Sequence, residues 1–151
     1  MDSSNSQSKP SRTSLSTATI IVALCVCVYW MILFYATHTT LPPGMLPGNS
    51  DKVVHFTSYG LLGALLLSLR WTRGGFGWVS IVARWLVLAC YGAFDEVTQL
   101  LVNRTADVHD WFADIGGAAV GLAITAFILS RWKKVERSDE VSPNVPDAVT
   151  S

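Results

Sequence analysis

The chain alternates long apolar stretches with short polar segments. No Asp, Glu, Lys or Arg occurs between Thr13 and Ser50, and most of that region is apolar. A helix needs roughly 20 apolar residues to cross about 30 Å of hydrocarbon. Stretches that reach or approach this length lie at residues 15–36, 53–69, 78–102 and 111–130. We therefore predict an all-α integral membrane bundle of four transmembrane helices.

The ends of the chain and its composition leave little room for a soluble domain. Residues 1–14 and 131–151 are polar and predict disordered tails on either side of a membrane domain at 15–130. Only 15% of the 151 residues are charged, against about 25% in typical soluble domains. The formal net charge is zero, so the basic excess that nucleic-acid binding requires is missing. The expected partner is the lipid bilayer, with no nucleic acid.

The distribution of Lys and Arg predicts the orientation of the chain. Cytoplasmic loops of membrane proteins are enriched in these residues. If the chain crosses four times, nine of the 11 fall on the side of the termini: Lys9, Arg12, Arg70, Arg73, Arg84, Arg131, Lys133, Lys134 and Arg137. Only Lys52 and Arg104 fall on the other side. Both termini are therefore predicted to be cytoplasmic.

Most of the unusual polar residues lie toward the predicted outer ends of the last three spans. Residues four apart share a helix face, so Asp51, His55 and Tyr59 lie on one face of the second span. The same spacing relates Asp95 and Gln99 on the third. Further polar residues of this region are Lys52, Tyr91, Glu96, Arg104, Asp107, His109, Asp110 and Asp114. We predict that three helices bring these groups together.

The predicted depth of two carboxylates makes this region informative. Glu96 lies seven residues before Asn103, which is about 10 Å along a helix, and Asp95 is slightly deeper. An unpaired charge at such depth costs at least a few kcal/mol, so ionisable residues in spans usually face the bundle interior and serve a function. A polar network that only holds the helices together is the structural alternative.

A metal site is a narrower alternative. His55, His109 and several carboxylates could ligate Zn or Mn. No ligand pair of the H-E-x-x-H type occurs, and no cofactor motif is visible, so we predict neither a metal nor a cofactor. The remaining histidine, His38, lies in a Pro-rich segment and is expected at the surface.

The fourth predicted span carries a stripe of small residues. Ala113, Gly117 and Gly121 recur at four-residue spacing, a pattern that allows two helices to approach closely. Gly60 and Gly63 on the second span could form the facing groove. Packing inside the bundle is favoured over oligomerisation through this span, because four helices must already find each other.

Three motifs of the outer region resemble those of VanZ-like membrane proteins. Residues 51–59 (DKVVHFTSY) are similar to the family's D-K-x-x-H-F-x-x-Y opening, and residues 91–99 (YGAFDEVTQ) to its Y-G-x-x-D-E-x-x-Q segment. Arg104, Asp110 and Gly117 have the spacing of its R-x5-D-x3-N-x2-G ending. The chain departs from the family at Asp114, where Asn is usual, and so gains an acid.

The resemblance covers residues 51–121 and implies a small multi-span protein of the bacterial cytoplasmic (inner) membrane. The founding member of the family is associated with low-level resistance to teicoplanin, a lipid-tailed glycopeptide that binds cell-wall precursors. The resemblance thus implies a place in the cell envelope. It does not specify a reaction.

The leading functional hypothesis is an outward-facing polar pocket that recognises a cell-envelope lipid, a precursor or another amphiphile. In this hypothesis Lys52 and Arg104 face anions, and carboxylates and Gln99 form hydrogen bonds. The predicted binding residues are Asp51, Lys52, His55, Tyr59, Asp95, Glu96, Gln99, Arg104, Asp110 and Asp114.

Two other functions stay open. A membrane enzyme would modify a lipid-linked or cell-wall substrate, with His55, Asp95 and Glu96 as candidate acid–base residues. A small proton-linked transporter is the third hypothesis, which the location of the acids on one side of the membrane makes less favourable.

Overall fold

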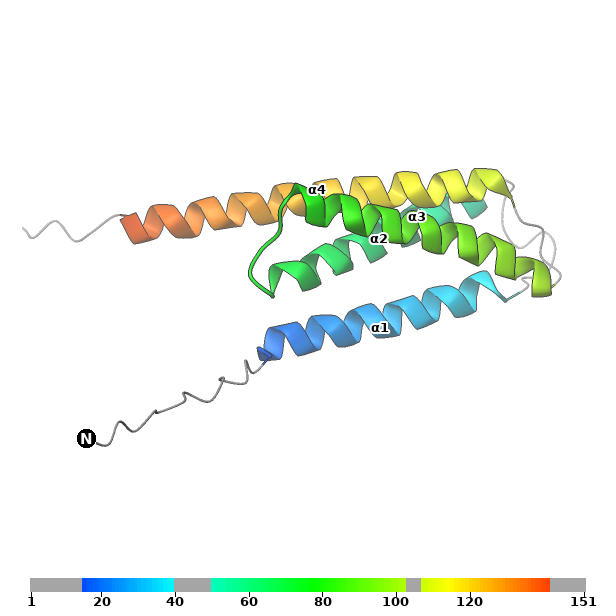
Figure 1. The fold of residues 1–151 in the computed structure, drawn as a ribbon, viewed down its shortest axis with the longest axis horizontal. Coiled ribbons are helices and arrows are strands. Elements are labelled where there is room, and N and C mark those ends of the chain that lie inside the picture. Colours follow the sequence, from blue (N-terminus) through cyan, green and yellow to red (C-terminus); the bar gives the residue numbers. More distant parts are fainter. Residues whose placement is uncertain (1–14, 40–49, 103–106, 142–151) are drawn as a thin grey trace, which may run out of the picture.

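A computed structural model describes residues 15–39, 50–102 and 107–141, with side chains described as far as Lys134. The described residues form helices joined by short turns, and no strand occurs among them. The elements are α1 (Thr17–Thr37), α2 (Ser50–Trp71), α3 (Trp78–Gln99), a 3-10 turn (Leu100–Val102) and α4 (Val108–Val141). Successive helices run in opposite directions, and α1 begins at the same end of the bundle at which α4 finishes (Figure 1).

The helices present apolar side chains to their surroundings. Leu24, Val87 and Phe127, on three different helices, are all exposed. Each of the four helices contains a stretch that is long and apolar enough to cross a membrane. Large exposed apolar surfaces are unfavourable in water and normal in lipid. The all-α bundle of four span-length helices predicted from the apolar pattern is therefore confirmed for the described residues.

The small-residue stripe of α4 packs against α2 inside the bundle. A methyl group placed on Gly117 would overlap the backbone carbonyl of Phe56, and one on Gly121 would overlap that of Gly60. A methyl group on Gly63 would lie 3.1 Å from the carbonyl oxygen of Ala118. The two backbones are thus in direct contact, as the expected close approach of these helices requires.

Next to this contact the bundle has an apolar core, and α1 packs against that core. Leu33 of α1 joins a buried group that also contains Tyr59, Leu62, Leu88 and Ala118. Polar contacts add to this packing, since the Tyr29 hydroxyl donates to the carbonyl of Ser58 at 3.1 Å and the rings of Trp30 and Tyr91 meet edge to face.

The fourth helix is longer than the sequence predicts. The apolar pattern ends near Ser130, and a disordered tail is expected beyond it, but α4 continues to Val141. The expectation of disorder at 131–141 is therefore wrong. This segment is rich in Arg, Lys and Glu, which are good helix formers whether or not they face lipid. The other predicted tail residues, 1–14 and 142–151, lie outside the described residues.

The α2–α4 contact predicts a sharp difference between neighbouring glycines. Gly117→Ala should destabilise the protein by about 1–3 kcal/mol, because the added methyl group forces the two backbones apart. Gly116→Ala is the matched control, since its methyl group would meet only the Phe56 ring at 3.6 Å. It should be neutral or stabilising by up to about 1 kcal/mol through helix propensity. Unfolding in detergent measures both, and equal effects of the two substitutions would contradict the proposed packing.

Candidate ligand-binding site

Buried polar side chains gather toward one end of the bundle. At this end α1 and α3 finish and α2 and α4 begin (Figure 1). We call this group the polar cluster and define it as His55, Tyr59, Asp95, Glu96, Gln99, Asp110 and Asp114. Each of these residues is less than a tenth exposed. The helical spacing within each span explains the arrangement, because residues three or four apart share the face that points inward.

The centre of the polar cluster is a contact between α2 and α4. Nδ1 of His55 lies 2.9 Å from Oδ1 of Asp114, and the two side chains are 3% and 0% exposed. The other ring nitrogen, Nε2, is 4.0 Å from Oδ1 of Asp51. Asp114, the position at which the chain departs from the VanZ-like motif, is therefore the direct partner of the motif histidine.

A second set of contacts ties α3 to α1. The Thr37 hydroxyl donates to Oδ1 of Asp95 at 3.0 Å, and the Gln99 amide donates to Oδ2 at 3.3 Å. His38 lies 2.9 Å from the Thr98 hydroxyl, and its side chain is only 13% exposed. The expectation that His38 lies at the surface is wrong, because α1 ends beside α3.

Sequence reasoning missed the contribution of α1 altogether. Thr37 is a single polar residue at the end of an apolar stretch, where no periodic pattern identifies an inward face. His38 follows directly, which places both side chains at the level of the acids. The signal that could have found them is their position at the predicted outer end of the first span, on the same side of the membrane as the acids.

The connection between α3 and α4 is anchored by Glu96. Its Oε2 accepts a hydrogen bond from the backbone N–H of Asp107 at 2.9 Å. This bond holds the beginning of α4 next to the end of α3. It also fixes the orientation of the Glu96 carboxylate within the polar cluster.

The rim of the site is a charged group around Lys52. The ammonium Nζ lies 3.1 Å from Oδ2 of Asp107 and 3.0 Å from Oδ1 of Asp110. Hydrogen bonds from the backbone N–H of His109, from its ring and from Lys52 hold the pKa of Asp107 well below its usual range. Lys52 was predicted to face an anionic ligand, and here its charge is balanced by two carboxylates.

Several buried polar atoms have no hydrogen-bond partner among the described residues. They are the hydroxyl oxygens of Tyr59 and Tyr91, Oε1 of Glu96 and Oδ2 of Asp114. The two tyrosine rings stack, with centroids 6.0 Å apart. A buried polar atom without a partner costs about 1–3 kcal/mol. Two phenolic and two carboxylate oxygens in the described part of the chain therefore carry this cost.

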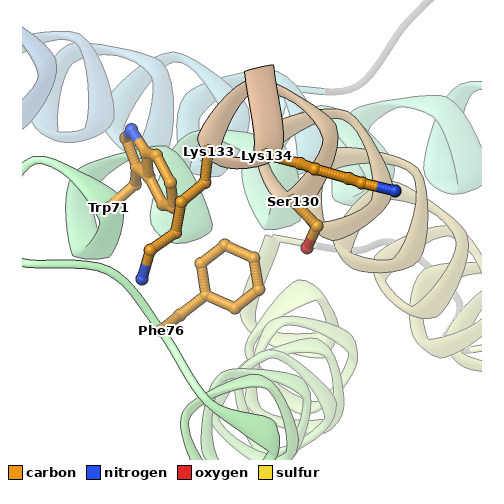
Figure 2. Close-up of a pocket in the computed structure, with 5 residues that line it drawn as sticks. All are labelled: Trp71, Phe76, Ser130, Lys133 and Lys134. Carbon is orange, nitrogen blue, oxygen red and sulfur yellow. The ribbon is translucent and has the colours of Figure 1, made fainter. Parts of the chain in front are cut away.

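A separate cavity lies at the opposite end of the bundle. It has a volume of about 330 Å³ and is lined by Trp71, Phe76, Ser130, Lys133 and Lys134. The Lys133 side chain extends past the two aromatic rings, whereas Lys134 points away from them (Figure 2). Among the described residues, one end of the bundle is therefore basic and aromatic, and the opposite end is acidic. None of the predicted site residues lines this cavity.

The predicted site residues fall into three groups. His55, Tyr59 and the residues of α3 and α4 named as the polar cluster are buried together, as the helical spacing indicates. Asp51 and Lys52 lie at the rim and are partly exposed. Arg104 lies outside the described residues. That this region binds a ligand stays a prediction.

Four span-length apolar helices around a buried polar cluster define a multi-pass membrane protein. The family model described as VanZ/LLP1 matches residues 4–129, and the chain therefore belongs to the VanZ/LLP1 family. This match confirms the resemblance seen in the three motifs. Neither a search of the curated proteins nor a search of the solved structures found a match.

The His55–Asp114 contact generates a stability prediction. His55→Ala should destabilise the protein by about 3–5 kcal/mol, because a fully buried carboxylate loses its partner. Adding Asp114→Asn should recover part of this loss, since a neutral amide is less costly to bury. Unfolding measurements on the single and double variants test this. A double variant less stable than His55→Ala alone would contradict it.

Proposed function

We propose that this protein recognises the polar headgroup of a cell-envelope lipid, precursor or other amphiphile through the polar cluster. The observation that carries the proposal is the set of buried, unpartnered atoms on Tyr59, Tyr91, Glu96 and Asp114. Sites with a few convergent polar groups in an apolar frame are typical of small-molecule binding. The apolar helix surfaces would accommodate the hydrocarbon tail, and the polar cluster would receive the headgroup.

The charges of the site favour a headgroup that donates hydrogen bonds. Lys52 is already balanced by Asp107 and Asp110, whereas Glu96 and Asp114 each carry an acceptor oxygen without a partner. A headgroup with hydroxyl or amino groups, as in a glycolipid or a sugar-bearing precursor, satisfies such oxygens. The phenols of the two tyrosines would in turn donate to its ring or ester oxygens.

We place this site on the extracytoplasmic side of the bacterial cytoplasmic membrane. The excess of Lys and Arg on the side of the termini supports this orientation. Because the founding member of the family is associated with low-level resistance to teicoplanin, we expect a bacterium that produces this protein to be less susceptible to teicoplanin than one that does not. The same strain carrying Glu96→Gln should lose this difference.

Lipid identification on the purified full chain tests the proposed recognition. Tyr59→Phe removes one buried hydroxyl and should reduce the amount of co-purified ligand by about two- to twelvefold, as expected for one hydrogen bond of about 0.5–1.5 kcal/mol. Tyr35→Phe is the matched control, because Tyr35 is exposed on α1. Mass spectrometry of bound lipids compares the variants. Identical lipid profiles for the wild type, Tyr59→Phe and Glu96→Gln would contradict the proposal.

A membrane enzyme is a second candidate because of one specific observation. The ring of His55 is hydrogen-bonded to Asp114 and lies close to Glu96. One ring nitrogen of His55 and one carboxylate oxygen of each acid all lie within 4.8 Å of one another. An imidazole between two carboxylates is suited to exchange protons with a substrate. Asp95 is less suited, because Thr37 and Gln99 occupy both of its oxygens.

The two candidate functions differ in the fate of the ligand. An enzyme should convert the bound lipid to a product of different mass, and His55→Ala and Glu96→Gln should each abolish the conversion. Incubation of the identified lipid with the purified protein, followed by mass spectrometry, measures this. Recovery of unchanged lipid from the wild type would remove the enzyme hypothesis and leave the binding proposal intact.

A further inference from the structure

The inner part of the polar cluster has the composition of a metal centre. His55 on α2, Glu96 on α3 and Asp114 on α4 each offer one potential ligand atom, and these atoms all lie within 4.8 Å of one another. All three side chains are buried. We propose that these residues bind one divalent transition-metal ion, with Zn²⁺ and Mn²⁺ as the principal candidates. This inference does not require the proposed lipid recognition.

The spacing of the three residues is close to that of a bound ion. Two ligand atoms that hold Zn²⁺ at about 2.0–2.2 Å in tetrahedral geometry lie about 3.4 Å apart. Because the three ligand atoms all lie within 4.8 Å of one another, no pair has to shorten by more than about 1.4 Å to reach this distance. Because each ligand comes from a different helix, the ion would connect α2, α3 and α4.

The unpartnered oxygens provide an independent observation. Glu96 and Asp114 are each held at one carboxylate oxygen, by the Asp107 backbone N–H and by His55 respectively. The second oxygen of each, Oε1 and Oδ2, is buried and has no partner among the described residues. The Asp107 N–H orients the Glu96 carboxylate and leaves one oxygen available, as outer contacts at metal sites typically do. The His55–Asp114 hydrogen bond would be replaced by ligation of the ion by both side chains.

The charge of the cluster also favours a cation. Two ionised carboxylates and a neutral imidazole would balance one divalent ion. Lys52, the cation that the structure describes at this end of the bundle, is already in contact with Asp107 and Asp110. An ion would therefore stabilise two acids that are otherwise costly to keep ionised at this depth.

The geometry of His55 indicates which ring nitrogen would bind. Nδ1 faces Asp114 at 2.9 Å, and Nε2 faces Asp51 at 4.0 Å. If Nδ1 binds the ion, Nε2–H can donate toward Asp51, which is the usual carboxylate–histidine–metal arrangement. A second possible set, Asp51, His55 and Asp110, is less suitable because Asp110 already accepts from Lys52.

The donor types select among metals. One imidazole nitrogen and two carboxylate oxygens suit Zn²⁺ and Mn²⁺, whereas Mg²⁺ and Ca²⁺ prefer oxygen ligands alone. Asp114 supplies the second negative charge of this ligand set. Asp114→Asn keeps the shape of the side chain and removes this charge.

Metal titration of the full chain in detergent tests the proposal. The chelator-treated protein should bind one equivalent of Zn²⁺ or Mn²⁺ by calorimetry and elemental analysis, and the metal should raise its Tm. Asp114→Asn and Glu96→Gln should each weaken binding by at least about tenfold. Asp107→Asn is the matched control, because it removes a carboxylate at the rim but keeps the backbone N–H that holds Glu96, and it should bind like the wild type.

Three results would overturn the proposal. They are the absence of stoichiometric binding by the wild type, unchanged binding by Asp114→Asn, and a loss in Asp107→Asn equal to that in Asp114→Asn. Visible absorption of the Co²⁺-substituted protein gives a second readout, because its bands report nitrogen and oxygen ligation and should change in Glu96→Gln. Circular dichroism checks that each variant is folded.

The same experiment separates this proposal from lipid recognition. The lipid profile is measured on protein with and without the metal. If the wild type binds no metal and still retains its lipid after chelator treatment, the metal site alone is overturned. Metal binding with no change of lipid profile in Tyr59→Phe and Glu96→Gln would overturn the recognition proposal alone.

Discussion

The direct backbone contact between α2 and α4 is the constraint on which the site depends. Gly117 lies against the carbonyl of Phe56. Toward the acidic end, His55 directly precedes Phe56 on one helix, and Asp114 lies three residues before Gly117 on the other. A wider separation of the helices would place the imidazole and the carboxylate out of hydrogen-bonding reach. The small-residue stripe therefore sets the geometry of the polar cluster as well as the packing of the bundle.

Much of this arrangement could be predicted from the sequence. Apolar length identified the four helices, because the thickness of a bilayer sets a simple requirement. Four-residue spacing placed Asp51, His55 and Tyr59 on one face, and the glycines of the fourth span indicated a close helix pair. Each of these inferences uses a regularity within a single helix. The family motifs then joined the three segments into one region.

The contacts between helices could not be predicted in the same way. Nothing in the apolar α1 indicates which of its faces meets α3, so the bond from Thr37 to Asp95 is visible only once the helices are packed. Lys52 is likewise a free cation in the sequence, and only the start of α4 beside it brings Asp107 and Asp110 within reach. The extension of α4 to Val141 depends on helix propensity, which an argument from apolar length does not include.

The parallel course of α2 and α4 has an electrostatic consequence. Both helices begin at the acidic end, and each carries an acid in its first turn, Asp51 on α2 and Asp110 on α4. The peptide dipoles of a helix sum to about half a positive charge at its N-terminus. Two neighbouring helices that point the same way repel each other through these dipoles. The carboxylates at their common origin offset that repulsion, so the acids that define the site also stabilise the helix pair that carries them.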